Sequence, residues 1–386
     1  MAIARSARRL DIVFDTYQSN SIKNVTREGR GMGVKIVFKE EDMLPDDLKD
    51  FFLNEDNKKN FYQIIQKQAA NPLFWEWTGE VTITFGQRVW SRNDGVKDIV
   101  QWRDEVHEEA DNRMLVHAQD FMESADDAKC IVIRTNDTDV VVLFLTFFEQ
   151  FLQFNDQADF WIDFGLGDYR RFISIKRSYD LMGDSICLAL PFFHAFSGCD
   201  STSSFYRKTK RSLFDYWMTY PKQEVITAAF QQLSWQPSAA VIESQFPAVE
   251  EFVAYSFGLK DQKSVDEARF EIFRSSSAGN LRELPPSQNS LKLHVLRSAY
   301  QSGWVWGNTL SSQDLPLLTD WGWKYDENSR IRIHWFKEDL NSGRMKLLEL
   351  IKTCKCKIGA RCLNCSCGKK YFLCLSYCNC KASCRK

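Results

Sequence analysis

The sequence predicts an α/β fold in its N-terminal half, a mostly helical region after it, and a small cysteine-rich module at the C-terminus. Between residues 10 and 174, short strand-like runs alternate with segments of helical spacing, as is typical of a largely parallel sheet flanked by helices. After about residue 175 helical patterns replace most of the strand-like runs. Nine of the 12 cysteines then fall within Cys354–Cys384.

The expected strands are short and apolar. LDIVF ends at Asp15, and EVTITF places Val81, Ile83 and Phe85 on one face. KCIVIR has the apolar character of a strand buried on both faces. ADFWIDF follows, and GLGD is a turn into YRRFISI. These predicted strands cover residues 10–14, 80–85, 129–134, 158–164 and 169–175.

Helical spacing marks two further sets of segments. The first set covers residues 46–70, 104–125 and the helix that opens in NDTDVVVLFL. The second set covers residues 176–197, 203–219, 222–234 and 264–274, and the prolines of LPPSQNSLKL suit one more helix start. DWGWKYDENSRIRIHWF predicts a hairpin with a DENS turn, in which the tryptophans pack.

These elements predict three parts. Residues 1–215 form the α/β domain, residues 216–350 form a mostly helical extension with a Trp-rich hairpin, and residues 351–386 form the cysteine-rich tail.

Charge is distributed unevenly along the chain. The net charge is −1, but residues 351–386 carry nine Lys or Arg and no acidic residue, which leaves a net charge of −10 on the first 350. A basic tail on an acidic body predicts a polyanionic partner such as DNA. We find no apolar run of about 18 residues and no apolar signal-peptide core, so we expect no membrane partner and an intracellular location.

Acidic residues recur where predicted strands end and predicted helices begin. Because the carboxyl ends of parallel strands share one edge of a sheet, residues far apart in sequence can converge there. Clustered carboxylates repel one another, and Mg²⁺ or Mn²⁺ would neutralise them with the oxygen ligands that these ions prefer. Two such ions about 4 Å apart support phosphodiester hydrolysis. The alternative is that these residues are helix caps and solvated turn residues.

This ordered set resembles the flap-endonuclease branch of the PIN-like nucleases. The resemblance covers residues 10 to 215 and lies in VFDTYQSNSIKNVTREGR, EEADNRML, RTNDTDVVVL and HAFSGCDSTSSF. It implies a two-metal nuclease site with a fixed set of carboxylate ligands. Those ligands are Asp15, Glu109, Asp111, Asp137, Asp139 and Asp200. In a regular helix Glu108 would share a face with Asp111, so Glu108 stays an alternative to Glu109.

Two differences from that family lead to further expectations. The family has a strand and an Asp before the position of Asp15, so either the chain is a fragment or the site has lost a ligand. After the G-C-D turn the family has a glycine-rich motif that grips DNA, whereas TSSFYRKTKRSLFDYW has no glycine. Its basic side chains either contact phosphates or form a solvated helix face. They are Arg207, Lys208, Lys210 and Arg211.

The tail pattern C-x-C-x5-C-x2-C-x-C-x6-C-x3-C-x-C-x3-C predicts a zinc cluster. Closely spaced thiols make strained disulfides, and an odd number cannot pair completely. Nine thiolates can instead form about three tetrahedral Zn²⁺ sites if three of them bridge. The pattern resembles the tesmin-type CXC domain, which implies DNA binding, with Lys369, Lys370 and Tyr371 as the contact loop. The predicted ligands are Cys354, Cys356, Cys362, Cys365, Cys367, Cys374, Cys378, Cys380 and Cys384.

Other enzyme classes have little support in the sequence. No G-x-S-x-G and no H-E-x-x-H motif occurs, and we expect His194 to be a core histidine. The first hypothesis is therefore a metal-dependent, structure-selective DNA nuclease with a zinc-cluster DNA-binding tail, located in the nucleus. The second is a catalytically decayed DNA-binding protein, with descent from a mobile element as one origin. A third is an interaction scaffold whose zinc tail binds protein.

Overall fold

The computed structural model describes most of the chain up to residue 336. The described residues are 7–16, 21–23, 25, 33–69, 79–92, 95–98, 107–124, 130–261, 263–275, 281–311 and 313–336. Residues 1–335 belong to one compact unit, and residues 336–386 are separate from it. The nine tail cysteines, together with Lys369, Lys370 and Tyr371, lie outside the described residues, so the zinc module stays a prediction.

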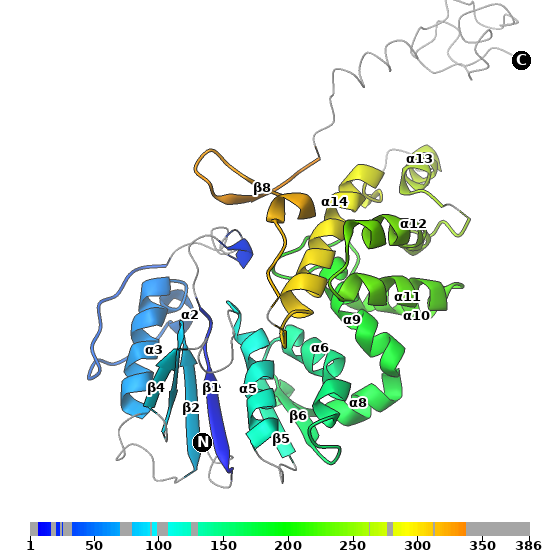
Figure 1. Cartoon of the computed structure of the whole chain (residues 1–386). Coiled ribbons are helices and arrows are strands. Elements are labelled where there is room, and N and C mark those ends of the chain that lie inside the picture. The colour runs from blue at the N-terminus through cyan, green and yellow to red at the C-terminus, as the bar shows by residue number, and fades with distance from the viewer. Residues whose placement is uncertain are drawn as a thin grey trace, which may run out of the picture. The chain divides into compact units, whose positions relative to one another are not determined.

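The described residues form a mixed α/β fold (Figure 1). A first sheet has the order β1-β2-β3-β4, a second has the order β5-β6-β7, and β8 pairs with β9. The strands are β1 (Arg9–Val13), β2 (Glu80–Phe85), β3 (Arg88–Ser91), β4 (Gly95–Asp98), β5 (Cys130–Thr135), β6 (Asp159–Phe164), β7 (Arg171–Ser174), β8 (Trp323–Tyr325) and β9 (Ile331–Ile333).

The prediction of a largely parallel sheet is wrong. The parallel pairs among the described strands are β1–β2 and β5–β6, whereas β2–β3, β3–β4, β6–β7 and β8–β9 are antiparallel. The reason is connection length, since a parallel crossover needs a dozen or more residues. Only residues 86–87 join β2 to β3, and residues 165–170 join β6 to β7 through a 3₁₀ turn, η2 (Gly167–Tyr169).

Strand β5 also differs from its prediction. It was expected to be buried on both faces, but Val132 is 44% exposed and Arg134 is exposed as well, while Ile133 is buried. Strand β5 pairs only with β6 among the described strands, and one of its faces is open. An apolar run alone does not distinguish a strand with one open face from a fully covered strand.

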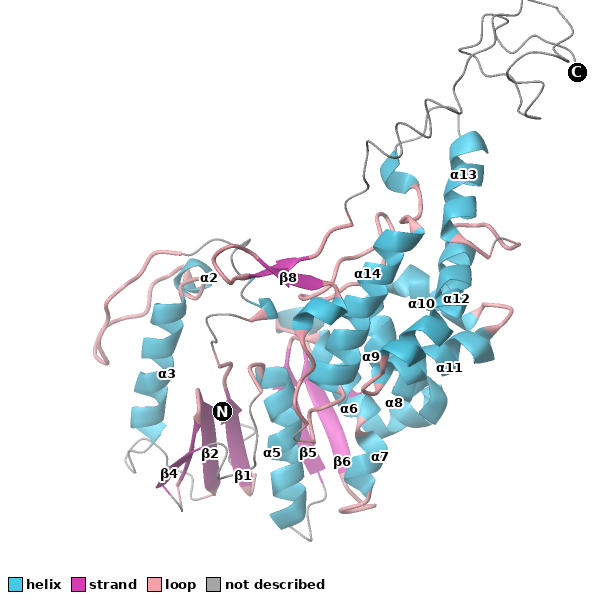
Figure 2. Ribbon diagram, turned by 45° about the horizontal axis from the view of Figure 1, so that its top comes forward, coloured by secondary structure: helices cyan, strands magenta, loops and turns pink. Residues whose placement is uncertain are grey.

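Helices make up most of the remaining described chain. They are α2 (Leu48–Phe51), α3 (Glu55–Ala69), α5 (Ala110–Ser124), α6 (Thr138–Thr146), α7 (Phe148–Leu152), α8 (Ile175–Met182), α9 (Asp184–Ser197), α10 (Lys210–Met218), α11 (Gln223–Ser234), α12 (Ala239–Ser256), α13 (Val265–Ser275) and α14 (Gln288–Ala299). Short helical turns are η3 (Leu281–Glu283), η5 (Leu318–Trp321) and the π-helical η4 (Tyr300–Trp306). In both ribbon views α5 stands between β1 and β5 (Figures 1 and 2).

Helix α9 lies at the centre of the helical part. Its rings Phe192, Phe193 and Phe196 pack on Phe230 of α11. Pro191 lies inside α9 and has no N–H to donate, and the hydroxyl of Thr146 donates at 3.2 Å to the carbonyl of Cys187, four residues earlier. The helix therefore continues past the proline to its end at Ser197.

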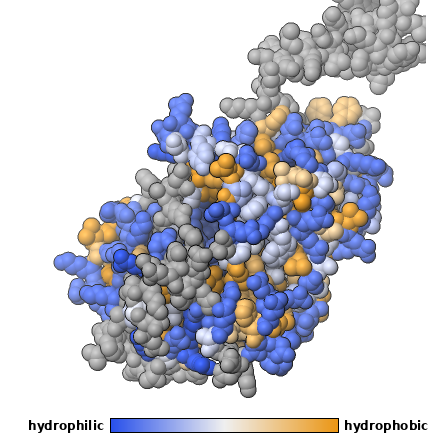
Figure 3. Space-filling model, in the orientation of Figure 1, coloured by the Kyte–Doolittle hydropathy of each residue, from blue (hydrophilic) through white to orange (hydrophobic). Residues whose placement is uncertain are grey.

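A single hydrophobic core joins the predicted α/β domain to the predicted helical extension. It contains buried residues from Leu115 to Ile331, including Trp217, Phe230 and Trp321. The Trp-rich segment forms the predicted hairpin, and its residues Trp321 and Trp323 are buried. Hydrophobic residues interrupt a mostly hydrophilic surface on the face shown in Figure 3. Within the described residues, no helix is both long and apolar enough to cross a membrane.

Candidate metal centre

Three of the six predicted carboxylates converge. One carboxylate oxygen each from Asp111, Asp137 and Asp139 lies within 4.8 Å of the other two. Asp111 lies in the first turn of α5, whereas Asp137 and Asp139 lie at the start of α6, directly after β5. The placement of the D-x-D pair at the carboxyl end of a strand is as predicted. These three residues are the candidate metal centre.

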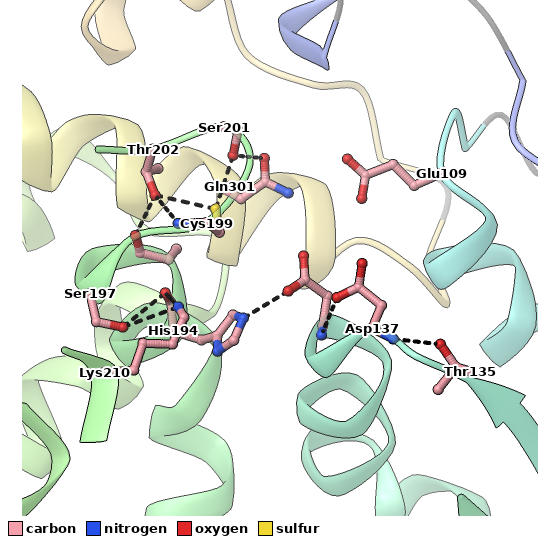
Figure 4. Close-up of polar contacts among 12 residues, drawn as sticks. Glu109, Thr135, Asp137, His194, Ser197, Cys199, Ser201, Thr202, Lys210 and Gln301 are labelled. Carbon is pink, nitrogen blue, oxygen red and sulfur yellow. Dashed lines mark hydrogen bonds and ion pairs between the residues drawn. The ribbon is translucent and has the colours of Figure 1, made fainter. Parts of the chain in front are cut away.

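Asp137 is both the N-cap of α6 and one of the three converging carboxylates. It is the N-cap of α6, where its Oδ1 accepts a hydrogen bond from the backbone N–H of Asp139 at 2.9 Å. Its own N–H donates to the Thr135 hydroxyl at 3.0 Å (Figure 4). The cap interpretation and the metal-ligand interpretation are therefore compatible, because the cap holds the carboxylate in place at the mouth of the centre.

Asp139 is held by a histidine. Its Oδ1 lies 2.7 Å from Nε2 of His194 on α9. Burial acts to raise the pKa of Asp139, but the hydrogen bond and the charge of His194 outweigh it and lower that pKa. His194 is buried, as expected from its apolar surroundings. No sequence pattern around His194 indicated that it would contact a candidate ligand.

Burial and mutual repulsion act on the other carboxylates of the centre. Burial first, and then the neighbouring charges of Asp137, Glu109 and Asp139, raise the pKa of Asp111 to about 8 despite the opposing effect of Lys23. Burial and the nearby Asp139 also raise the pKa of Asp137. A divalent cation would relieve both effects, because it favours the ionised carboxylates.

Two predicted ligands lie beside the centre and are bound to other groups. Asp15 accepts a hydrogen bond at 2.9 Å from the backbone N–H of Ala110, the first residue of α5. Glu109 is buried, and its Oε2 lies 3.1 Å from Nζ of Lys23. Burial raises the pKa of Glu109 to about 7, although Lys23 opposes the rise. Burial acts to lower the pKa of Lys23, but the charges of Glu109, Asp111 and Asp15 outweigh it and raise that pKa.

The choice between Glu108 and Glu109 depends on where α5 begins. The helix begins at Ala110, so Glu109 precedes it and the regular-helix argument for Glu108 does not apply. Glu108 accepts a hydrogen bond from the Ser21 hydroxyl at 2.8 Å. Neither glutamate belongs to the three converging carboxylates, but the charge of Asp139 adds to the burial that raises the pKa of Glu109.

A pocket of about 370 Å³ opens beside the centre. Asp200 is exposed and lines this pocket with Asp137 and Asp139, but it is not one of the converging three. The pocket has a mixed lining of acidic, basic and hydroxyl groups. Its residues are Asp137, Thr138, Asp139, His194, Gly198, Cys199, Asp200, Thr202, Ser204 and Lys210.

The four basic residues of the predicted helix have different surroundings, and two of them, Arg207 and Arg211, are exposed. Helix α10 begins at Lys210, not at residue 203, because the Thr209 side chain caps it together with Ser212. Arg207 pairs with Glu283 at 2.6 Å, and Lys208 donates to the Ser256 carbonyl at 2.6 Å. Of the four predicted phosphate contacts, only Lys210 lines the pocket.

Lys210 and Arg211 have different surroundings. Lys210 Nζ donates to the His194 carbonyl at 2.7 Å, and burial lowers the pKa of Lys210 against the opposing effects of Cys199, Asp139 and Asp137. Arg211 is exposed and does not line the pocket.

The sequence reasoning missed two residues at the site. Lys23 lies in a basic segment that was predicted only as a helix or loop, although that segment belongs to the nuclease resemblance. Gln301 lies in η4, and its Oε1 accepts a hydrogen bond from the Ser201 hydroxyl at 2.7 Å. No motif surrounds Gln301, so only the tertiary fold reveals it.

Comparison with protein-family models, with curated proteins and with solved structures finds no match to this chain. The resemblances to PIN-like nucleases and to CXC domains therefore stay predictions from the sequence.

Proposed function

We propose that the compact unit is a metal-dependent DNA nuclease of the PIN-like, flap-endonuclease type. Mg²⁺ or Mn²⁺ would be held by Asp111, Asp137 and Asp139. The observation that carries the proposal is the convergence of these three carboxylates, from two helix starts, within 4.8 Å. A set of only oxygen donors suits Mg²⁺ or Mn²⁺ better than zinc or copper.

The local architecture supports the PIN-like part of the proposal. The parallel pair β5–β6 carries the D-x-D pair at its carboxyl end, and the G-C-D turn at residues 198–200 reaches the same pocket. A second metal position would use Asp15, Glu109 or Asp200. Because Asp15 caps α5 and Glu109 pairs with Lys23, one ion bound by the converging three is the simpler arrangement.

A bound metal ion would supply Lewis-acid stabilisation of a phosphoryl oxygen and a water of lowered pKa. The residues of the chain orient the components around it. The α6 cap fixes Asp137, and His194 fixes Asp139. Lys23 offsets the charge of Glu109, and Lys210 presents an ammonium group at the pocket wall, where a phosphate oxygen would bind.

In this proposal the cysteine-rich tail binds DNA. Its nine cysteines would hold about three Zn²⁺ ions, and its basic residues would keep the acidic body on DNA. The tail is needed for this because the first 350 residues have a net charge of −10 and would be repelled by phosphates at long range. Since DNA is the proposed substrate, we propose that the protein acts in the nucleus.

A second candidate function is DNA binding without catalysis. The observation that favours it is the internal neutralisation of the acidic cluster. Lys23 lies against Glu109, so part of the negative charge is offset without a metal ion, and His194 contacts Asp139 at 2.7 Å. In this case the carboxylates would be structural and the tail would provide the DNA affinity.

The test uses the full chain loaded with zinc and end-labelled flap, bubble and single-stranded DNA in Mg²⁺ or Mn²⁺. Asp111→Asn and Asp139→Asn change the centre, and Asp215→Asn changes an exposed carboxylate of α10 as the control. The proposal predicts cleavage by the wild type and the control, and a loss of about 10³-fold or more in both centre variants. DNA binding without cleavage would favour the second candidate, and the absence of both would overturn both.

A further inference from the structure

Gln301 connects the last part of the helical region to the turn that lines the pocket beside the candidate metal centre. Its side chain is only 4% exposed, and its Oε1 accepts the Ser201 hydroxyl hydrogen at 2.7 Å. This hydrogen bond fixes the orientation of the amide. In Figure 4 the amide nitrogen is turned away from Ser201, toward the side on which Glu109 and Asp137 lie.

The amide nitrogen of Gln301 is an unused donor. The described part of the chain provides no hydrogen-bond acceptor for Nε2, although the residue is more than nine-tenths buried. Nε2 itself is not one of the buried atoms without a partner, so this donor lies at the open surface of the site, where a ligand can reach it. Gln301 also lies in the π-helical segment η4, a distortion that is frequent at functional sites.

The chemistry of the donor limits its partner. An amide N–H cannot bind a cation, so Gln301 does not add a metal ligand. It is free to donate to an acceptor oxygen that a ligand brings in. A phosphate supplies such oxygens, but the carboxylates of the centre would repel it until a cation has neutralised them. The donor would therefore be used after the metal has bound.

We propose that Gln301 Nε2 donates a hydrogen bond to a non-bridging phosphate oxygen of the substrate at the metal-loaded centre. This inference rests on the proposed metal-dependent nuclease function. It makes Gln301 a substrate-contacting residue and gives the C-terminal helical region a part in the site. Ser201 is a positioning residue, because its hydroxyl holds the amide in the donating orientation.

The test compares the wild-type full chain with Gln301→Glu. This substitution keeps an acceptor for the Ser201 hydroxyl and replaces the donor with a carboxylate oxygen. Gln245→Glu makes the same charge change on α12, on the surface, and serves as the control. Mn²⁺ affinity is measured by electron paramagnetic resonance, and the affinity for inorganic phosphate is measured by calorimetry at saturating Mn²⁺.

Phosphate affinity is expected to fall without a loss of Mn²⁺ affinity. In Gln301→Glu, phosphate affinity falls about tenfold or more, because a charge-assisted hydrogen bond is lost, while Mn²⁺ affinity is unchanged or higher. A general structural defect would instead weaken both. Unchanged phosphate affinity with intact Mn²⁺ binding would overturn the role of Gln301 and leave the metal centre standing. A wild type that binds no Mn²⁺ would overturn the proposed function and this inference with it.

Discussion

Burial determines the protonation of the carboxylates at the candidate metal centre. Because the pKa of Asp111 is raised to about 8, most of this residue is neutral at pH 7 without a metal ion. The pKa of Asp139 is lowered by His194 against the effect of burial, so this residue is ionised. The two ligands should therefore respond differently to the same substitution.

Asp111→Asn and Asp139→Asn should differ in stability but not in metal binding. At pH 7 the unfolded chain ionises Asp111, whereas the folded chain holds it neutral at a cost, so Asp111→Asn removes this cost and should stabilise the metal-free protein by up to about 4 kcal/mol. Asp139→Asn removes the ionised partner of His194 and should cost about 1–3 kcal/mol. Both should lose Mn²⁺ binding. Urea unfolding in metal-free buffer and Mn²⁺ titration measure the two effects, and equal destabilisation of both variants would contradict the assignment.

His294 should make stability depend on pH. Burial lowers the pKa of His294 to about 4 from its ordinary value of 6.5, although its hydrogen bond to the Phe196 carbonyl opposes the shift. The unfolded chain therefore binds a proton between these values and the folded chain does not. Stability is full above about pH 6.5 and falls as the pH falls toward 4.

Between pH 7 and pH 5 this single group should cost about 2 kcal/mol. The measurement is urea unfolding of the wild type and of His294→Gln across that range. The variant should be less stable at pH 7 but should lose about 2 kcal/mol less on acidification. Parallel pH profiles for the two proteins would show that His294 does not titrate on unfolding.

At the level of single residues, the sequence predicted those site residues that lie in a distinctive local pattern. Asp137 and Asp139 were found because a D-x-D pair directly follows an apolar strand. Lys23 and Gln301 were not found, because nothing in their neighbouring sequence distinguishes them from ordinary surface residues. Their places depend on contacts with Glu109 and Ser201, which are more than 80 residues away in sequence.

Among the elements, the turn between α9 and α10 controls the shape of the pocket. Gly198 ends α9 with φ +113°, and a Cβ there would lie 2.7 Å from Cβ of Ser204. Gly183, between α8 and α9, also has a positive φ of +82°, but a Cβ there would meet nothing within 4 Å. Substituting each glycine with alanine therefore separates two costs. Both variants have the strain of a positive φ, but only the Gly198 variant also has a steric conflict.

Gly198→Ala should be more harmful than Gly183→Ala. Gly183→Ala carries only the cost of a positive φ, about 1–2 kcal/mol. Gly198→Ala adds a close contact with Ser204 and should cost about 3 kcal/mol or more, with lower Mn²⁺ affinity because the pocket wall shifts. Thermal unfolding and Mn²⁺ titration provide the comparison. Equal losses for the two variants would contradict a tight turn at Gly198.

Element prediction failed where tertiary packing outweighed a local signal. Helix α12 was not predicted, and Pro247 lies in its interior, where a proline normally marks a helix end. Burial of Ile242, Phe246, Val249 and Phe252 stabilises the helix on both sides of the proline. The parallel sheet was overpredicted because the apolar runs do not show which strands are joined by short hairpins.

At the scale of the whole molecule, one hydrophobic core spans residues from Leu115 to Ile331, so it determines which shorter chains can fold. A chain of residues 1–215 lacks Trp217 and Phe230, and so it would expose the apolar rings of α9 that pack on them. Each such ring buries about 150–250 Å². A chain of residues 1–335 keeps the complete core.

Residues 1–335 should therefore unfold cooperatively, whereas residues 1–215 should not. The expected result for the shorter chain is aggregation, or a compact state with helical circular dichroism but no cooperative thermal transition. Circular dichroism and limited proteolysis of both chains provide the test. A cooperative transition in the 1–215 chain would show that the predicted boundary at residue 215 separates two independent domains.

The most direct test of the metal centre is anomalous diffraction from crystals grown with Mn²⁺. We predict an anomalous peak within ligand distance of carboxylate oxygens of Asp111, Asp137 and Asp139, and its loss in Asp111→Asn. The contradicting result is a wild-type structure in which Mn²⁺ is absent from these carboxylates, while Lys23 still contacts Glu109 and His194 still contacts Asp139.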